Sequence, residues 1–462
     1  MNKVIETNNS NQVTWAYLKT PDGLISYGAT NYFNESPLFR NLEIKTYDSN
    51  YDVETLVRYG DTSSYYYPSW SICKVHNHYY GGGGKEIDDT LFASLIKFDS
   101  AGSVLWEKNY LTSYELAITD YVIAKDDKIY LSGRYINNPN GATDVFLIEC
   151  DTSGAIQWQK FFGVFNNGDE VKGLNPTDDG GFILSTIRHI WGGNWITVVY
   201  KLDEDGNIQW TKNLGGGGER WQLSCSQLPD GGYFCRGFAM PVFHQDSWFV
   251  RLDGAGNVLN DTIISFSPLQ DFASPSCNMQ IVNNSIRVTG QHNDQFVTGA
   301  LKSYYASFDM DGNFEWIRYF YRRTNENLLT TQIPLPNNFM LLAGFVFPNN
   351  NPPDGTTADE WIVIVDEHGC EVADCALSVL NPKGEDPQWE VFPNPTSEYF
   401  TLKTNVPLHR YELYTLQGQL VQQGSLTQNN SISVSKLPQG VYILTAFPFD
   451  SHKPLVSKLV KH

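Results

Sequence analysis

The sequence predicts an all-β protein, a β-propeller of four-stranded blades followed by a small antiparallel β-sandwich. Three observations predict this fold class: a turn motif that recurs every 50 to 57 residues, a second kind of turn between its copies, and a C-terminal segment of short alternating strands. The chain has 462 residues, of which 41% are hydrophobic and 14% aromatic. Single cores stop growing at about 250–300 residues, so we expect two domains or a repeat architecture.

The recurring motif is Asp-x-x-Gly between two apolar runs, as in KLDEDGNIQW, where Asp203 and Gly206 are followed by Trp210. Asp at the first position and Gly at the fourth favour a type I turn that closes a hairpin. A calcium loop needs acids on a longer frame that ends in a distal Glu, whereas the inner residues vary freely here. We therefore interpret the motif as a turn. Its glycines are Gly102, Gly154, Gly206, Gly256, Gly312 and Gly369, with Gly23 in a weaker copy.

A second turn follows most of these glycines after 25 to 28 residues. Two hairpins in each repeat give four strands, which is the unit of a propeller blade. The recurrent Trp and Tyr positions should fill the gaps between stacked blades. The second turns lie at Asn77, Asp127, Gly180, Gly231, Asn284 and Asn338.

The number of blades follows from the length of the repeating region. Residues 13 to 376 divide into about seven repeats, so we predict seven blades, with six as the alternative. The 54 residues between Gly23 and Asn77 leave room for a degenerate hairpin or an insertion. We expect the strand VTWAYLK (13–19) to pair with the last blade and close the ring, which removes exposed strand edges.

The domain boundaries follow from a change in composition after the last repeat. We predict the propeller for residues 1–379 and a linker for residues 380–388, which are polar and contain Pro and Gly. Residues 389–462 alternate short apolar strands with turns, as in a small antiparallel sandwich.

Both domains resemble known families. The Asp-x-x-Gly-x-x-x-Trp repeats resemble the propeller repeats of secreted Bacteroidota proteins. Residues 389–462 resemble the type A C-terminal sorting domain of the type IX secretion system. This resemblance implies delivery by the type IX translocon and sortase, followed by secretion or attachment to the outer-membrane surface. The matching residues are Pro393, Asn394, Pro395, Gly418, Gly440, Tyr442, Lys458 and Lys461.

Charge limits the classes of partner. The formal net charge is −19, and residues 389–462 hold four acids and six bases, so this segment carries +2 and the remainder −21. Such an acidic body disfavours nucleic acid and anionic membrane surfaces. No run of about 18 apolar residues is present, so we expect no transmembrane segment. Residues 1–15 lack the apolar core of a signal peptide, and because the resemblance implies export, we expect that a leader is missing.

The cysteines suggest disulfides rather than catalysis. Cys225 and Cys235 lie five residues on either side of Asp230, so they should face each other across a hairpin. We treat Cys225–Cys235 and Cys370–Cys375 as candidate disulfides of an exported protein. The remaining Cys73, Cys150 and Cys277 should be buried thiols.

Other candidate motifs are weak. The glycine runs 81–84 and 215–218 lack a phosphate-loop frame, and we expect both to connect blades. His76 and His78 alternate, but two His without a third ligand make a poor metal site. We therefore assign no catalytic residue, no cofactor-binding residue and no metal ligand.

The favoured function is a non-enzymatic, exported binding module for an extracellular glycan or protein. An exported propeller hydrolase or lyase that acts on polysaccharide is the alternative. A third hypothesis is a quinone-dependent propeller oxidoreductase, because the Asp-x-x-Gly-x-x-x-Trp repeat also resembles that family. A propeller fold by itself does not choose among these functions.

Overall fold

A computed structural model of the chain contains two compact units, residues 1–373 and 374–462. The predicted linker and the boundary at residue 379 lie outside the described residues and stay predictions. The structure describes residues 2–5, 11–31, 40–60, 63–111, 116–136, 141–164, 167–190, 194–215, 220–239, 246–264, 270–273, 279–294, 300–320, 327–346, 359–371, 389–404, 408–415, 419–426, 431–448 and 455–462.

The first unit is a propeller with seven blades in its described part, which confirms the favoured count. Blades 1 to 4 comprise β2 (Asn11–Lys19), β3 (Leu24–Asn31), β4 (Arg40–Tyr47) and β5 (Val53–Tyr59); β6 (Tyr65–Val75), β7 (His78–Ile87), β8 (Thr90–Phe98) and β9 (Val104–Tyr110); β10 (Ala117–Lys125), β11 (Lys128–Ile136), β12 (Thr143–Cys150) and β13 (Ile156–Phe162); and β14 (Gly168–Pro176), β15 (Phe182–Ile190), β16 (Asn194–Leu202) and β17 (Ile208–Leu214).

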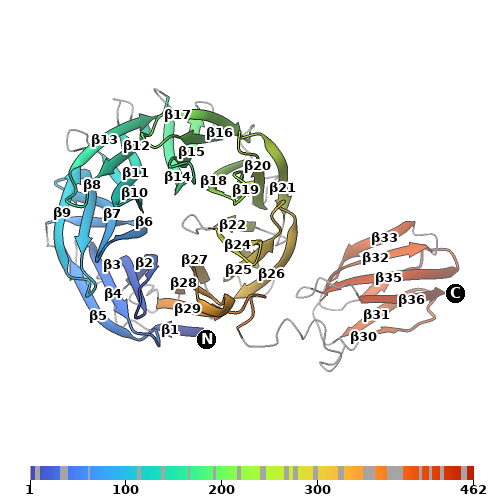
Figure 1. Ribbon diagram of the computed structural model, residues 1–462. Helices are drawn as coiled ribbons and strands as arrows, with labels where there is room; N and C mark the ends of the chain where they lie inside the picture. Colours follow the sequence, from blue (N-terminus) through green and yellow to red (C-terminus); the bar gives the residue numbers. More distant parts are fainter. Residues whose placement is uncertain are drawn as a thin grey trace. The chain divides into compact units, whose positions relative to one another are not determined.

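Blades 5 to 7 continue the ring in chain order (Figure 1). They comprise β18 (Arg220–Gln227), β19 (Tyr233–Ala239), β20 (Asp246–Leu252) and β21 (Val258–Ile264); β22 (Gln270–Ala273), β23 (Gln280–Val282), β24 (Ser285–Asp294), β25 (Ala300–Phe308) and β26 (Phe314–Phe320); and β27 (Asn327–Pro334), β28 (Met340–Val346), β29 (Asp359–Val365) and β1 (Asn2–Ile5). A short 3-10 turn, η1 (Pro336–Asn338), joins β27 to β28. In blade 6, β22 and β23 both pair with β24 and together replace one inner strand.

The first strand of each blade lies nearest the axis of the ring and the last strand lies outermost (Figure 1). The last blade takes its outer strand from the start of the chain, because β1 pairs antiparallel with β29. This closure corrects the expectation for VTWAYLK, which forms β2, the inner strand of blade 1. A tight turn at residues 20–23 pairs that segment with β3, and the shorter NKVI segment closes the ring instead.

The Asp-x-x-Gly motif forms the turn between the third and fourth strands. The amide of Gly206 donates to the carbonyl of Asp203 over 3.1 Å, and Gly206 has a φ of 75°. The carboxylate of Asp203 accepts from the amides of Asp205 (3.0 Å) and Asn207 (2.7 Å). The Asp203 carboxylate therefore accepts hydrogen bonds from the backbone of its own turn.

Blade 1 holds the degenerate copy of this turn, at Asp48 to Tyr51. The Tyr51 amide donates to the Asp48 carbonyl over 2.9 Å, and Tyr51 adopts a φ of 61° without being glycine. Of the two alternatives for the segment between Gly23 and Asn77, the degenerate hairpin is the one present. The placement of Gly23 in the Asp-x-x-Gly series was wrong, since Gly23 lies in the inner turn between β2 and β3.

The glycine of one turn meets the tryptophan of the preceding blade. A Cβ on Gly154 would lie 2.8 Å from Cη2 of Trp106, and a Cβ on Gly206 would lie 2.8 Å from Cη2 of Trp158. The same pairing joins Gly256 to Trp210 and Gly369 to Trp316. At these turns one blade supplies the glycine and the preceding blade supplies the indole, whereas Gly102 meets Ile44 and Gly312 meets Phe234 instead.

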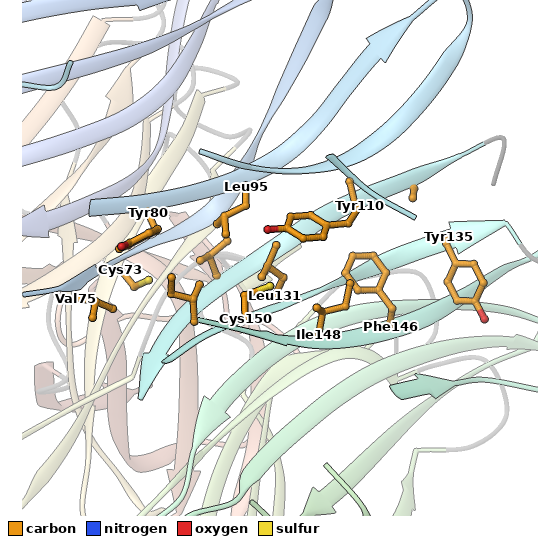
Figure 2. Packing of buried hydrophobic residues seen from close by; sticks show 14 residues of the cluster. Cys73, Val75, Tyr80, Leu95, Tyr110, Leu131, Tyr135, Phe146, Ile148 and Cys150 are labelled. Atoms are coloured by element: carbon orange, nitrogen blue, oxygen red, sulfur yellow. The ribbon is translucent and has the colours of Figure 1, made fainter. Parts of the chain in front are cut away.

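Apolar side chains fill each interface between neighbouring blades in the described part of the ring. Figure 2 shows the cluster between blades 2 and 3, where Tyr80 and Leu95 face Leu131 and Ile148. Packing of blade faces against each other is the main stabilising contribution that a propeller offers.

The glycine run 81–84 contributes to this packing. The expectation that it connects two blades was wrong. It lies within β7, where a Cβ on Gly81 would lie 2.8 Å from the Tyr27 ring and a Cβ on Gly82 would lie 2.5 Å from Val122. Its two faces therefore receive side chains from blades 1 and 3. Gly215 follows β17, between blades 4 and 5, and residues 216–218 lie outside the described part.

The second unit is a sandwich of two sheets around one apolar core. Phe400 and Leu402 from one sheet and Leu413 and Leu444 from the other belong to that core. Its strands are β30 (Trp389–Phe392), β31 (Tyr399–Thr404) and β34 (Ser431–Ser433) in one sheet, and β33 (Leu420–Ser425), β32 (Leu408–Thr415), β35 (Gly440–Pro448) and β36 (Leu455–Lys461) in the other.

Candidate binding site in the propeller channel

Six of the seven blades have a β-bulge near the middle of their inner strand, within the described part of the ring. At the bulge the inner strand has at least one residue more than its partner strand, which bends the strand and re-aims its side chains. Bulges of this kind often lie next to functional sites. The residues left out of the pairing are Trp15, Ser69–Ser71, Asp120, Lys172, Gln222–Leu223 and Thr330. We call Trp15, Trp70, Asp120, Lys172 and Thr330 the collar.

The two collar tryptophans come from neighbouring blades and contact each other. The Trp15 and Trp70 ring centroids lie 4.3 Å apart at an interplanar angle of 67°, and Trp15 also lies 5.7 Å from Phe345 of blade 7. Trp70 belongs to blade 2 but packs against the apolar cluster between blades 3 and 4. The pair therefore links blade 7 to the apolar cluster between blades 3 and 4, and both indoles stay partly exposed.

A cavity of about 320 Å³ adjoins the collar. On three neighbouring strands its wall includes the residue that follows a collar residue, namely Ser71, Tyr121 and Gly173. This volume is at the lower end of the range for small-ligand pockets. The lining residues are Leu18, Ser71, Ile72, Cys73, Lys74, Tyr121, Val122, Ile123, Ala124, Gly173, Leu174, Asn175 and Ser224.

Several polar groups of the cavity wall bind neighbouring inner strands. The Ser71 hydroxyl donates to the Val122 carbonyl over 2.9 Å and accepts from the Val122 amide over 2.8 Å. Asn175 donates to the Cys225 carbonyl over 2.8 Å. These side chains already bind the protein backbone. We therefore look for ligand-recognising groups in the collar.

The collar carries charge between blades 3 and 4. Lys172 Nζ lies 2.8 Å from Glu170 Oε2, and Arg134 lies 3.3 Å from the same oxygen. Burial raises the pKa of Asp120 to about 6, although Arg134 and Lys172 oppose this shift. Burial also raises the pKa of Glu170, but Lys172 and Arg134 together outweigh it and the net shift is downward. Two neighbouring carboxyls therefore have pKa values that are pushed apart.

Sequence patterns did not single out the collar. The signal available was a lone acid within the apolar run AITDYVIAK, which places Asp120 in an otherwise buried strand. Trp15 and Trp70 carried no such signal, because a bulge changes the alternation of faces and is not visible in the sequence.

The predicted sorting residues lie in the sandwich, where Asn394 binds the final strand. Its amide donates to the Lys458 carbonyl over 2.6 Å, and its side-chain oxygen accepts from the Val460 amide over 2.9 Å. The amide of Thr396 continues this pairing to the Val460 carbonyl over 2.9 Å. Pro393 and Pro395 flank the contact on both sides.

The other sorting residues are spread over the same unit. Gly440 begins β35, and the buried Tyr442 donates its hydroxyl to the Pro438 carbonyl over 2.8 Å. Lys458 is exposed and Lys461 is buried, both in β36. Gly418 lies outside the described residues.

One of the two candidate disulfides lies in the propeller. Cys225 and Cys235 are directly opposite each other in β18 and β19, are bonded to each other and are fully buried. Cys370 is also disulfide-bonded, and Cys375 lies outside the described residues. Cys73 and Cys150 are buried free thiols, while Cys277 falls in a range that is not described.

His76 lies in an exposed turn, with its Nε2 atom 3.3 Å from Asp127 Oδ1. No three His, Cys, Asp or Glu side chains gather as a possible metal site within the described ranges. Nothing helical in those ranges has both the length and the apolar character that a membrane span requires.

The fold and the tail together define an exported propeller protein. Residues 390–461 match the family described as "Secretion system C-terminal sorting domain". The chain thus ends in a type IX sorting domain, which marks a protein for export to the cell surface or the medium and implies an origin in Bacteroidota. None of the curated proteins matches the chain.

Solved structures with a similar fold differ widely in sequence. The extracellular domain of a hybrid two component system from B. thetaiotaomicron has 11% identity and a TM-score of 0.49, with coverage of 100% of this chain and 57% of that chain. A protein of unknown function from Dyadobacter fermentans has 10% identity and a TM-score of 0.45, with coverage of 66% and 96%. An alpha-L-arabinanase from Penicillium chrysogenum, complexed with arabinobiose, has 10% identity and a TM-score of 0.42, with coverage of 79% and 97%. This chain therefore spans just over half of the first of these chains.

Proposed function

We propose that this protein is a non-enzymatic binding protein that is exported by the type IX system and captures an extracellular glycan or protein with its propeller. The observation that carries the proposal is the collar, a set of aromatic, charged and polar residues at the bulges of five inner strands. Binding sites of this kind combine apolar surface with a few placed polar groups. The oxidised pair Cys225–Cys235 suits such a protein, because disulfides persist outside the cell.

A polysaccharide hydrolase or lyase is the second candidate. It is favoured by the Asp120 and Glu170 carboxyls, because a raised and a lowered pKa side by side suit a general acid and an ionised partner. Glu170 is already engaged by Lys172 and Arg134, so its carboxylate is held in ion pairs. We therefore rank binding above catalysis.

One experiment separates the two candidates. Purified protein is applied to a glycan array, is crosslinked to extracellular proteins, and is incubated with soluble polysaccharides while reducing ends and unsaturated products are measured. Specific binding without new chain ends supports the proposal. Release of chain ends that is lost in Asp120→Asn would establish the enzyme. Absence of glycan binding, protein crosslinks and chain cleavage would overturn both.

A further inference from the structure

Blade 2 carries three large side chains at one level of its sheet. Tyr80, Lys97 and Trp106 are cross-strand neighbours on its second, third and fourth strands. The Trp106 indole meets Gly154 in the following turn of blade 3. The Tyr80 hydroxyl donates to the Thr152 carbonyl in that turn over 3.2 Å, and Lys97 Nζ lies 3.5 Å from the same carbonyl. All three side chains therefore extend from blade 2 to the turn of blade 3.

Blade 1 has small side chains at the same level. The cross-strand neighbours there are Ile25, Thr46 and Thr55. The two threonine hydroxyls are hydrogen-bonded to each other over 2.7 Å, and Thr55 donates to the Ala101 carbonyl of blade 2 over 3.0 Å. Each of the three side chains is shorter than its counterpart in blade 2. Space therefore remains between blade 1 and the turn of blade 2 at residues 99–102.

A cavity of about 390 Å³ lies in this space. Ile25 and Thr46 line it from blade 1, and Ser100 lines it from the turn of blade 2. At the next interface along the ring, the places of Ile25 and Thr46 are taken by Tyr80 and Lys97. The cavity thus follows from the small residues of blade 1, and its volume is within the range of small-ligand sites.

Polar side chains of the cavity wall are accessible to a ligand. The exposed members of the wall include Asp22, Glu54, Lys74, Asn77 and Ser100. Within the described ranges, none of these five side chains forms a hydrogen bond or an ion pair. The Lys74 ammonium lies 5.3 Å from the centroid of the Tyr79 ring. The wall therefore offers two carboxylates, an ammonium, an amide and a hydroxyl.

The composition of the wall favours a polyhydroxylated ring over an aromatic one. Tyr47 and Tyr79 line the cavity but are each only 2% exposed, so little aromatic surface is open for stacking. An aromatic group from a partner would remove water from the charged side chains without replacing its hydrogen bonds, which is unfavourable. Sugar hydroxyls can both donate and accept. Two acids and one base give the wall a formal charge of −1, which disfavours an acidic sugar.

We propose that the cavity between blades 1 and 2 binds a neutral sugar residue, whose hydroxyls donate to Glu54 and accept from Lys74 and Asn77. This site is separate from the one proposed at the collar and stands on separate observations. Its position follows from blade 1, the blade in which short side chains replace the large ones of blade 2.

Calorimetry on the full chain tests the site with neutral oligosaccharides of arabinan, xylan, mannan and glucan as probes. We expect at least one probe to bind and Glu54→Ala to weaken that binding about tenfold or more, since a charged hydrogen bond is lost. The melting temperature should not change, because Glu54 is exposed. Glu54 is the residue to replace, since Lys74 also lines the cavity beside the collar.

Gln209→Ala is the matched control. Gln209 is exposed and precedes Trp210 in β17, as Glu54 precedes Thr55 in β5. It belongs to blade 4, whose Trp210 packs against the apolar cluster that blades 4 and 5 share. The control should therefore leave the affinity for the probe within about twofold of the wild type.

A cavity-filling variant tests the location independently. Ile25→Tyr places in blade 1 the phenol that Tyr80 supplies in blade 2, so it should block the cavity and keep the interface packed. We expect binding of the probe to be lost while the melting temperature stays close to that of the wild type. If Ile25→Tyr does not fold, Glu54→Ala decides alone.

The outcomes separate this inference from the proposed function. A probe that binds the wild type and either folded variant with equal affinity would overturn this site and leave the binding function at the collar standing. Capture of protein ligands alone, with no neutral saccharide bound, would also overturn it. Loss of all glycan and protein binding in the wild type would remove the proposed function as well.

Discussion

Gly206 shows why the turn motif combines a glycine with a distant tryptophan. Its φ of 75° lies in the left-handed region, and its Cα faces the Trp158 indole of the preceding blade. Two physical demands therefore meet at this residue: a backbone angle that suits glycine, and a close approach that leaves no room for Cβ.

Replacement of Gly206 by Ala should destabilise the propeller by about 2 kcal/mol or more, since both demands are violated. Gly231→Ala is the control. Gly231 has a φ of 82°, but no atom of the described residues lies within 4 Å of the place that a Cβ would take, so the variant should lose only about 1 kcal/mol. Urea denaturation of both variants measures the difference. Equal losses would mean that the contact with Trp158 is not tight.

Asp179 and Lys201 predict a pH dependence of stability. Lys201 is buried and donates to both carboxylate oxygens of Asp179, over 2.9 and 2.7 Å. Burial raises the pKa of Asp179, but the Lys201 hydrogen bond and others outweigh it and lower the pKa to about 2. The ionised acid therefore stabilises the fold above the unfolded-state pKa of about 4, and this contribution is lost as the pH falls through about 2.

Asp179→Asn should consequently lower the free energy of unfolding at pH 7 by about 1 kcal/mol, a modest value because Asp179 is 47% exposed. The difference from wild type should shrink between pH 4 and pH 2. Denaturation curves at several pH values measure it. A difference that stays constant down to pH 2 contradicts the ion-pair account.

Sequence patterns predicted single residues well where the backbone makes a local demand. The turn at Asp203 depends on residues 203 to 207, so its sequence predicted its structure. Asp120 and Trp70 depend on a bulge and on side chains from other blades, which are far away in the sequence. A local sequence pattern carries no information on contacts between distant residues. The collar could therefore not be predicted from the sequence.

At the scale of the element, β1 decides whether the ring closes. It pairs with β29 from Asn2 to Ile5, and the Asn2 side chain accepts from the Trp361 indole over 2.8 Å. The sequence predicted that an N-terminal strand would close the ring but chose residues 13–19. Residues 13–19 alternate apolar and polar side chains more clearly than residues 2–5 do. A tight turn, however, pairs residues 13–19 with β3, so they form the inner strand of blade 1.

Deletion of residues 1–5 should lower the melting temperature by several degrees and promote association, because it exposes the edge of β29. Lys3→Ala is the control: it removes the surface ion pair with Asp52 and a long hydrogen bond to the Asn50 carbonyl but keeps β1, and should cost less than about 1 kcal/mol. Calorimetry and light scattering measure the two effects. A deleted protein as stable and monomeric as the wild type would show that β1 does not close the ring.

The final strand β36 depends on Asn394 in a comparable way. Asn394→Ala removes both bonds to the backbone of that strand, and should destabilise the sandwich by about 1–3 kcal/mol. Hydrogen exchange of the full chain should show faster exchange in residues 455–461, with the propeller strands unchanged. Unchanged protection there would mean that Asn394 does not hold β36.

At the scale of the whole molecule, the fold class and the blade number followed from periodicity alone. A repeat of two hairpins leaves little choice of architecture, because a single four-stranded sheet cannot bury both of its faces. The identity of the ligand did not follow, since propellers with the same repeat carry unrelated sites. The sorting domain indicates that the protein is exported. The proposed binding function is based on the collar.

The central claim is that the C-terminal sorting domain directs export by the type IX system. The most direct measurement grafts residues 380–462 onto a reporter with a signal peptide, in a host with the type IX machinery and in a translocon-deficient strain. Fractionation should find the reporter at the surface or in the medium of the first strain and in the periplasm of the second. Equal external reporter in both strains would contradict the account.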